Sequence, residues 1–225
     1  MPNAEALAFD MYGTLVDPIR IWKQLEQYLP RDAQRIAEIW RQKQLEYTFR
    51  LTTMERYEDF EQVTGKALDY ALEACGHDLN TGQKNALMAQ YNDLERFADV
   101  EPGLQRLKNA GYNMVVFSNG SPAMLTAIMD AAGLNTYCSG FVSVDEVGVY
   151  KPSPKVYRHV ASRLGRPIES VRLISSNPFD VIGAEATGMQ ASWVNRSGGV
   201  FDTLAPPPQS IVSSLIELAD TLAQE

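Results

Sequence analysis

The amino-acid sequence predicts an α/β protein with a doubly wound parallel sheet and an inserted helical domain. Short apolar runs alternate with helical patterns along most of the chain. Each apolar run is bounded by Gly, Ser, Asn or Asp, as is typical of buried parallel strands. The alternation breaks between residues 17 and 97, where only helical patterns are found. These observations favour right-handed strand–helix crossovers with a helical insert after the first strand.

Five segments are predicted as strands, because each is short, mostly apolar and ended by small or polar residues. They are residues 6–10, 113–118, 140–144, 171–175 and 191–195. Helices are predicted at residues 103–110, 122–132, 154–164 and 179–187. A glycine follows each of them, where a left-handed residue commonly closes a helix: Gly111, Gly133, Gly165 and Gly188. A proline-rich connector at 205–209 leads into a last predicted helix at 210–223.

The insert is predicted to contain four helices and no strand. Their expected positions are residues 18–29, 31–50, 54–74 and 81–97. This placement divides the chain into an α/β core, residues 1–16 and 98–225, and a helical cap, residues 17–97. Because it is placed directly after the first strand, this insert is a candidate lid or cap domain.

Composition excludes several classes of protein. The 225 residues are 45% hydrophobic and carry a net charge of −8, with no cluster of basic residues, so nucleic acid is not an expected partner. No apolar run approaches the ~18–20 residues that span a bilayer, and Glu5 and Asp10 interrupt the first residues before a signal-peptide run could form. Cys75 and Cys138 have no metal-ligand spacing, so two free thiols are expected, which fits a reducing compartment such as the cytoplasm. No metal and no cofactor are expected.

Polar side chains follow four of the predicted strands at the point where each strand ends. In open α/β sheets, ligands bind outside these carboxyl ends. The residues so placed are Asp10 and Thr14, Ser118 and Asn119, Lys151, and Ser175, Asn177 and Asp180. Two carboxylates, a lysine, hydroxyls and amides are therefore expected to meet in one crevice.

These residues resemble the four motifs of the haloacid dehalogenase (HAD) superfamily. The matching segments are Asp10-Met-Tyr-Gly-Thr14, Ser118-Asn119, Lys151-Pro152 and Asp180. The resemblance covers essentially the whole chain, including the helical cap, and implies a HAD-like core. Most members of the superfamily are Mg²⁺-dependent phosphatases, so the fold alone does not fix the reaction.

Two departures from the phosphatase pattern favour a different reaction. The second aspartate of the first motif is replaced by Tyr12, whose ordinary phenol pKa near 10 makes it a poor acid or base at neutral pH. An acidic position of the fourth motif is replaced by Ser176. A hard divalent cation requires several anionic oxygens, and both changes remove them. The remaining pattern resembles the (S)-2-haloacid dehalogenases, which hydrolyse short 2-haloacids with inversion at C2.

This resemblance implies roles for the catalytic residues. Asp10 would attack C2 and form an ester, and water activated by Asp180 would hydrolyse that ester with help from Lys151 and Asn177. The remaining implied positions, which support the aspartates, the halide or the substrate carboxylate, are Thr14, Arg41, Ser118, Tyr157 and Ser175. Tyr157 fits a packing role on its helix equally well.

The resemblance also implies a binding pocket that the cap completes. Arg41 and Asn119 would bind the departing halide, with Phe179 as an apolar wall. The other pocket positions are Tyr12, Gln42, Leu45, Phe60 and, for the carboxylate, Ser118. Arg41 and Leu45 are spaced i and i+4, and one helix face can present both with Gln42 to the crevice.

Two alternatives remain open from the sequence. The first is a Mg²⁺-dependent HAD phosphatase with an altered first motif, and the second is a non-catalytic HAD-fold binding protein. The favoured interpretation is a metal-independent dehalogenase that acts on a small 2-haloacid. By the same resemblance, a homodimer is expected.

Overall fold

A parallel sheet forms the centre of the protein in the computed structural model, which describes residues 6–224. Six strands in this part of the chain are ordered β3-β2-β1-β4-β5-β6, and every neighbouring pair is parallel. They are β1 (Ala6–Phe9), β2 (Asn113–Ser118), β3 (Phe141–Ser143), β4 (Val171–Ser175), β5 (Gln190–Val194) and β6 (Ser210–Val212). The order reverses at β1, so the predicted doubly wound α/β class is confirmed.

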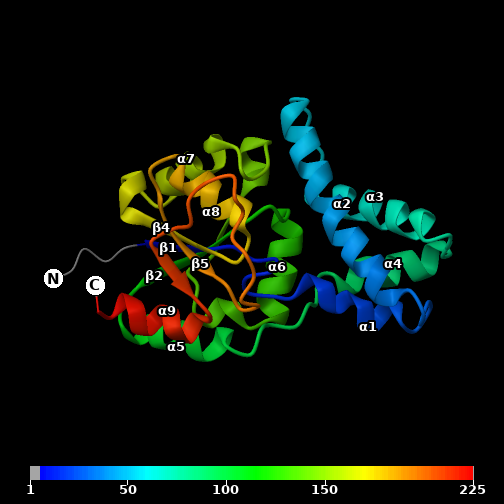
Figure 1. Cartoon of the computed structure of the whole chain (residues 1–225), viewed down its shortest axis with the longest axis horizontal. Coiled ribbons are helices and arrows are strands. Elements are labelled where there is room, and N and C mark those ends of the chain that lie inside the picture. The colour runs from blue at the N-terminus through cyan, green and yellow to red at the C-terminus, as the bar shows by residue number, and fades with distance from the viewer. Residues whose placement is uncertain (1–5, 225) are drawn as a thin grey trace.

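Helices cover both faces of the sheet. On one face α5 (Val100–Asn109) lies beside α9 (Leu215–Leu222), and α7 (Pro154–Arg163) and α8 (Pro178–Glu185) lie on the other (Figure 1). The close approach of α5 and α9 depends on Gly103, since a Cβ there would lie 2.5 Å from the Cβ of Leu215. The helix α6 (Pro122–Ala131) connects β2 to β3.

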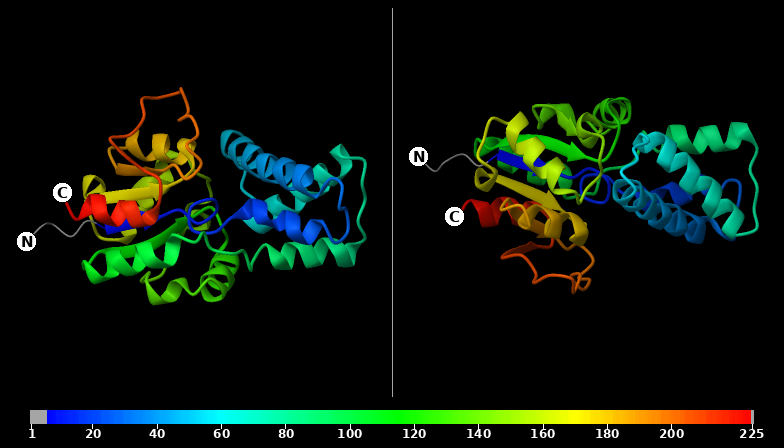
Figure 2. Two further views of the ribbon diagram at one scale, coloured as in Figure 1. Left: turned by 60° about the horizontal axis from the view of Figure 1, so that its bottom comes forward. Right: turned by 90° about the horizontal axis from the view of Figure 1, so that it is seen from above.

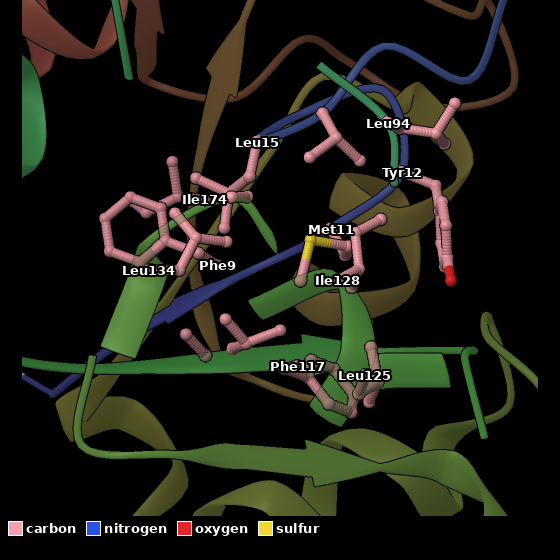
Figure 3. Packing of buried hydrophobic residues seen from close by; sticks show 14 of the residues in the cluster. Phe9, Met11, Tyr12, Leu15, Leu94, Phe117, Leu125, Ile128, Leu134 and Ile174 are labelled. Atoms are coloured by element: carbon pink, nitrogen blue, oxygen red, sulfur yellow. The ribbon is translucent and has the colours of Figure 1, made fainter. Parts of the chain in front are cut away.

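The core of the molecule begins at β1, where every residue is buried. Phe9, Met11 and Leu15 pack among buried side chains that include Leu125 and Ile128 of α6 (Figure 3). The apolar run of β1 has the composition expected for a strand that is buried on both faces. The residues that follow β1 are therefore held on a rigid support.

The residues between β1 and α5 form a helical bundle that lies beside the sheet (Figures 1 and 2). Its elements are the 3₁₀ helix η1 (Pro18–Ile21), α1 (Trp22–Leu25), α2 (Ala33–Thr53), α3 (Phe60–Ala74) and α4 (Thr81–Gln90). The two longest helices, α2 and α3, pack against each other, and the indole of Trp40 donates to the Thr64 carbonyl at 2.8 Å. Within residues 6–224 we find no helix with the length and apolar character that a membrane crossing requires.

Some predicted boundaries were wrong. The helix predicted at 54–74 starts at Phe60, because the Asp59 side chain accepts from Gln62 N and caps the helix there. The helix predicted at 210–223 is instead strand β6 followed by α9, which Ser214 caps. In the insert, the helix predicted at 18–29 divides into η1 and α1, and the one predicted at 81–97 ends at Gln90. The four predicted closing glycines all have positive φ, between 62° and 85°.

Candidate active site

Asp10 is the central acid of the crevice, directly after β1. Its main-chain N–H continues the sheet by donating to the Ile174 carbonyl at 3.0 Å, and the residue is 6% exposed. The carboxylate Oδ2 accepts from Asn177 Nδ2 at 2.7 Å, from Thr14 Oγ1 at 3.0 Å and from Ser175 Oγ at 3.5 Å. Oδ2 is thus fixed by three donors, which come from the segments that follow β1 and end β4.

The turn after Asp10 places these donors. Gly13 adopts φ 95°, which favours glycine, and donates to the Val16 carbonyl at 2.8 Å. The Thr14 hydroxyl accepts from Ser176 N at 2.8 Å, so its own proton is directed to Asp10. The geometry therefore orients a hydroxyl donor toward a carboxylate before any ligand binds.

Lys151 lies between the two carboxylates of the site. Its ammonium is 3.2 Å from Asp10 Oδ1 and 2.8 Å from Asp180 Oδ2, and it donates to the Phe117 carbonyl at 2.8 Å. The residue is 1% exposed, so all three N–H groups are used without solvent. Its main-chain N–H donates to Asn119 Oδ1 at 3.1 Å, which connects the lysine to the end of β2.

Asp180 lies in the first turn of α8 and is fully buried. Its Oδ1 accepts from the Tyr157 hydroxyl at 2.8 Å, which gives Tyr157 a contact with the site. Burial raises the pKa of Asp180 above the usual range, and the Lys151 ammonium offsets part of that rise. The tyrosine comes close because residue 183 is Gly, where a Cβ would lie 2.5 Å from the phenol oxygen.

The helical bundle contributes Arg41 from α2. Its guanidinium donates to the Tyr12 carbonyl at 3.0 Å and to Gln44 Oε1 at 2.7 Å. The same Tyr12 carbonyl accepts from Asn177 Nδ2 at 3.1 Å. Arg41 is therefore connected to the Asp10 carboxylate through two groups, the Tyr12 carbonyl and the Asn177 amide. The sequence predicted Arg41 here but missed Gln44, whose i, i+3 spacing from Arg41 is the available signal.

Tyr12 presents a buried hydroxyl that has no hydrogen-bond partner among the described residues. Its ring lies 5.3 Å from Phe60 and 5.6 Å from Tyr91, centroid to centroid. Burial raises the pKa of Tyr12 well above 10, so the phenol is neutral and keeps its proton. A buried donor without a partner is costly, and a bound acceptor would remove that cost.

The other predicted pocket residues are placed less distinctively. Ser118 is buried, and its Oγ accepts from Gly120 N at 3.1 Å. The Phe179 ring packs edge-on against Phe49 at 5.1 Å. Leu45 is half-buried on α2, and Gln42 is exposed. The roles proposed for all of these side chains stay predictions.

The side chain of Ser176 contacts a basic residue, Arg196. Its Oγ accepts from Arg196 at 3.2 Å, and Arg196 also forms a two-pronged ion pair with Asp99 at 2.9 Å. In the described part of the chain, no three His, Cys, Asp or Glu side chains form a group that could hold a metal ion. The cation between the two catalytic-site carboxylates is the ammonium of Lys151.

Comparison with known proteins agrees with this geometry. A family model described as haloacid dehalogenase-like hydrolase matches residues 4–188. The chain is 36% identical to an (S)-2-haloacid dehalogenase of Pseudomonas sp. (strain YL), with 99% of this chain and 97% of that protein covered. It is 35% identical to haloacetate dehalogenase H-2 of Moraxella sp. (strain B), with 99% and 100% covered. The solved L-2-haloacid dehalogenase of Xanthobacter autotrophicus with chloropropionic acid covalently bound superposes with a TM-score of 0.90 at 32% identity, with 97% of this chain and 98% of that chain covered.

Proposed function

The chain belongs to the family of haloacid dehalogenase-like hydrolases, and from this we propose that it hydrolyses short (S)-2-haloacids to (R)-2-hydroxyacids. The observation that carries the proposal is the asymmetric setting of the Asp10 carboxylate. Among residues 6–224, three side chains donate to Oδ2, whereas Oδ1 has only the Lys151 ammonium at 3.2 Å. Oδ1 therefore keeps a lone pair for attack while Oδ2 holds the carboxylate in place.

In the first step, Asp10 Oδ1 attacks C2 of the substrate from the side opposite the halogen. The new C–O bond forms as the C–halogen bond breaks, and the halide leaves with the bonding electrons. A fixed carboxylate in near-attack geometry supplies about 7–11 kcal/mol that free reactants lack. Arg41, Asn119 and Phe179 would surround the leaving halide, and inversion at C2 follows from the direction of attack.

In the second step, water attacks the Asp10 carboxyl carbon and gives a proton to Asp180. Negative charge then develops on Oδ2, where Thr14 and Asn177 already donate at 3.0 and 2.7 Å. Preorganised donors at a developing oxyanion are typically worth about 3–4 kcal/mol each. Collapse expels the hydroxyacid oxygen, which takes the proton from Asp180. The second proton of the water leaves the new Asp10 carboxyl for solvent, which restores the carboxylate. Because burial raises the pKa of Asp180, this carboxylate is a stronger base than an exposed aspartate.

We propose that residues 17–97 act as the cap of this site and the remainder as the core. Two contacts besides Arg41 support a closed arrangement: Tyr57 donates to Asp145 at 2.7 Å, and Tyr150 N donates to Thr52 Oγ1 at 3.1 Å. Tyr150 directly precedes Lys151, so the cap contacts the chain next to the catalytic lysine. The unpartnered Tyr12 hydroxyl would donate to the bound substrate, with Gln42, Leu45, Phe60 and Ser118 completing the pocket.

A homodimer and a cytoplasmic location are part of the proposal. Both described cysteines, Cys75 and Cys138, are free thiols, which suits a reducing compartment. Light scattering coupled to size-exclusion chromatography tests the dimer, and a monomeric mass at assay concentrations would contradict it.

The test of the proposed reaction is halide release from racemic 2-chloropropionate in EDTA, with the chirality of the product determined. We expect chloride equal to half of the added substrate and only (R)-lactate, and no chloride from the Asp10→Asn variant. Chloride from both enantiomers, or turnover that survives in Asp10→Asn, would contradict the proposal. Hydrolysis of p-nitrophenyl phosphate with Mg²⁺, in the absence of halide release, would favour a phosphatase instead.

A further inference from the structure

Gln44, a buried amide side chain of the cap, contacts Arg41. Gln44 is 0% exposed and lies one turn after Arg41 on α2. Its Oε1 accepts from Arg41 at 2.7 Å and from the Tyr91 hydroxyl at 3.0 Å, and its Nε2 donates to Thr64 Oγ1 at 2.6 Å. We propose that Gln44 is a positioning residue that aims the Arg41 guanidinium at the leaving halide.

The orientation of the amide follows from its partners. The Thr64 hydroxyl donates its one proton to the Phe60 carbonyl at 2.6 Å, one turn earlier on α3. It can therefore only accept from Gln44, so the amide nitrogen faces Thr64 and the oxygen faces Arg41. A flipped amide would place two N–H donors against a guanidinium and leave Thr64 facing an acceptor. Thr64 thus sets the direction of the hydrogen bond to Arg41.

This arrangement restricts a long and flexible arginine. One end of the guanidinium is held by Gln44 inside the cap, and the other donates to the Tyr12 carbonyl beside the nucleophile. The Asn177 amide bridges that carbonyl and Asp10 Oδ2, at 3.1 and 2.7 Å. An Arg41 released from Gln44 keeps its charge but loses its fixed position relative to the carbon that Asp10 attacks. Small misplacements of this kind reduce rates by about 10²-fold.

The inference rests on the proposed dehalogenation, and its test uses the leaving group. Chloride needs more electrophilic assistance than bromide, so loss of Arg41 positioning affects the chloride reaction more strongly. For Gln44→Leu we expect kcat on 2-chloropropionate to fall about 10²-fold, with a smaller loss on 2-bromopropionate. A purely structural defect would lower both rates in the same proportion.

Two further variants keep the test informative if Gln44→Leu is poorly folded. Thr64→Val should show the same bias against chloride, because the Gln44 amide is no longer oriented, and Thr64→Ser should restore the wild-type ratio. The matched control is Thr48→Val, which alters an equally buried α2 residue whose hydroxyl donates only to the Leu45 carbonyl. It should lose stability without changing the chloride-to-bromide ratio.

The outcomes separate the two proposals. If the wild type releases halide and the chloride-to-bromide rate ratio is unchanged in Gln44→Leu and Thr64→Val, only the positioning role is overturned. Wild type that releases no halide overturns the proposed reaction, and a crystal structure of Gln44→Leu then decides the positioning. In that structure, Arg41 away from the Tyr12 carbonyl supports the inference, and an unmoved Arg41 overturns it.

Discussion

Removal of the Lys151 ammonium should lower both the stability of the protein and the rate of halide release. The contacts of the ammonium give the expected loss of stability. Lys151→Met keeps the volume of the stem but leaves two buried carboxylates, Asp10 and Asp180, without the cation between them. Loss of one partner from a buried ion pair typically costs about 3–5 kcal/mol. For a domain of this size each kcal/mol shifts Tm by about 2–4 °C, which predicts a decrease of about 6–20 °C.

The pH dependence of that loss has a definite sign. The ammonium lowers the pKa of Asp180, so its removal moves the folded-state pKa of Asp180 further above the unfolded value. The folded Lys151→Met variant then binds more protons than its unfolded chain, and its stability increases as the pH falls. Urea denaturation at about pH 8 and about pH 5.5 should show a smaller deficit, relative to wild type, at the lower pH.

A second substitution tests whether charge is the cause. Lys151→Met combined with Asp180→Asn leaves Asp10 as the one carboxyl group of this pair, with Thr14 and Asn177 still donating to it. The double variant should recover much of the lost stability. Urea midpoints of the single and double variants at neutral pH measure this recovery. A Lys151→Met protein as stable as wild type, or a double variant no more stable than the single one, would refute the reasoning. Halide release should be lost in both variants.

Three further outcomes are expected. Tyr157→Phe removes a hydrogen bond that lowers the pKa of Asp180, so the acid limb of the kcat profile for halide release, set by deprotonation of this base, should move to higher pH. Thr14→Val removes an oriented donor to Asp10 and should lower kcat by about 10²-fold. The ester should then accumulate and be detected by mass spectrometry as an adduct, and an unchanged kcat would contradict the assigned role. Burial raises the pKa of Cys138 to about 12, so alkylation of this thiol at about pH 8, followed by mass spectrometry, should be at least about 10³-fold slower than that of an exposed cysteine.

The sequence was most informative where a residue type and a strand end coincide. Asp10 and Lys151 could be placed in one crevice because parallel strands end at the same edge of a sheet, and the structure puts their side chains 3.2 Å apart. The Phe117 carbonyl accepts a hydrogen bond from the same lysine. Because this carbonyl is a main-chain group, the residue type at position 117 could not predict the contact. Strand β6 escaped prediction because three residues at a sheet edge are too few to show a pattern.

Gln44 shows a different limit. Its spacing from Arg41 is visible in the sequence, but many exposed helical pairs have the same spacing. Its function depends on Thr64 and Tyr91, which approach from two other parts of the chain and fix its amide. Such a three-way contact exists only after the cap helices have packed, so composition and periodicity cannot predict it.

The central claim, that Asp10 attacks C2 and is then regenerated by water, is tested most directly by a single turnover in heavy-oxygen water with enzyme in excess. Hydrolysis of the ester at the carboxyl carbon predicts label in the peptide that contains Asp10 and unlabelled oxygen in the hydroxyl of the first lactate formed. Label in that first lactate, with Asp10 unlabelled, would mean that water attacks C2 directly and would contradict the account.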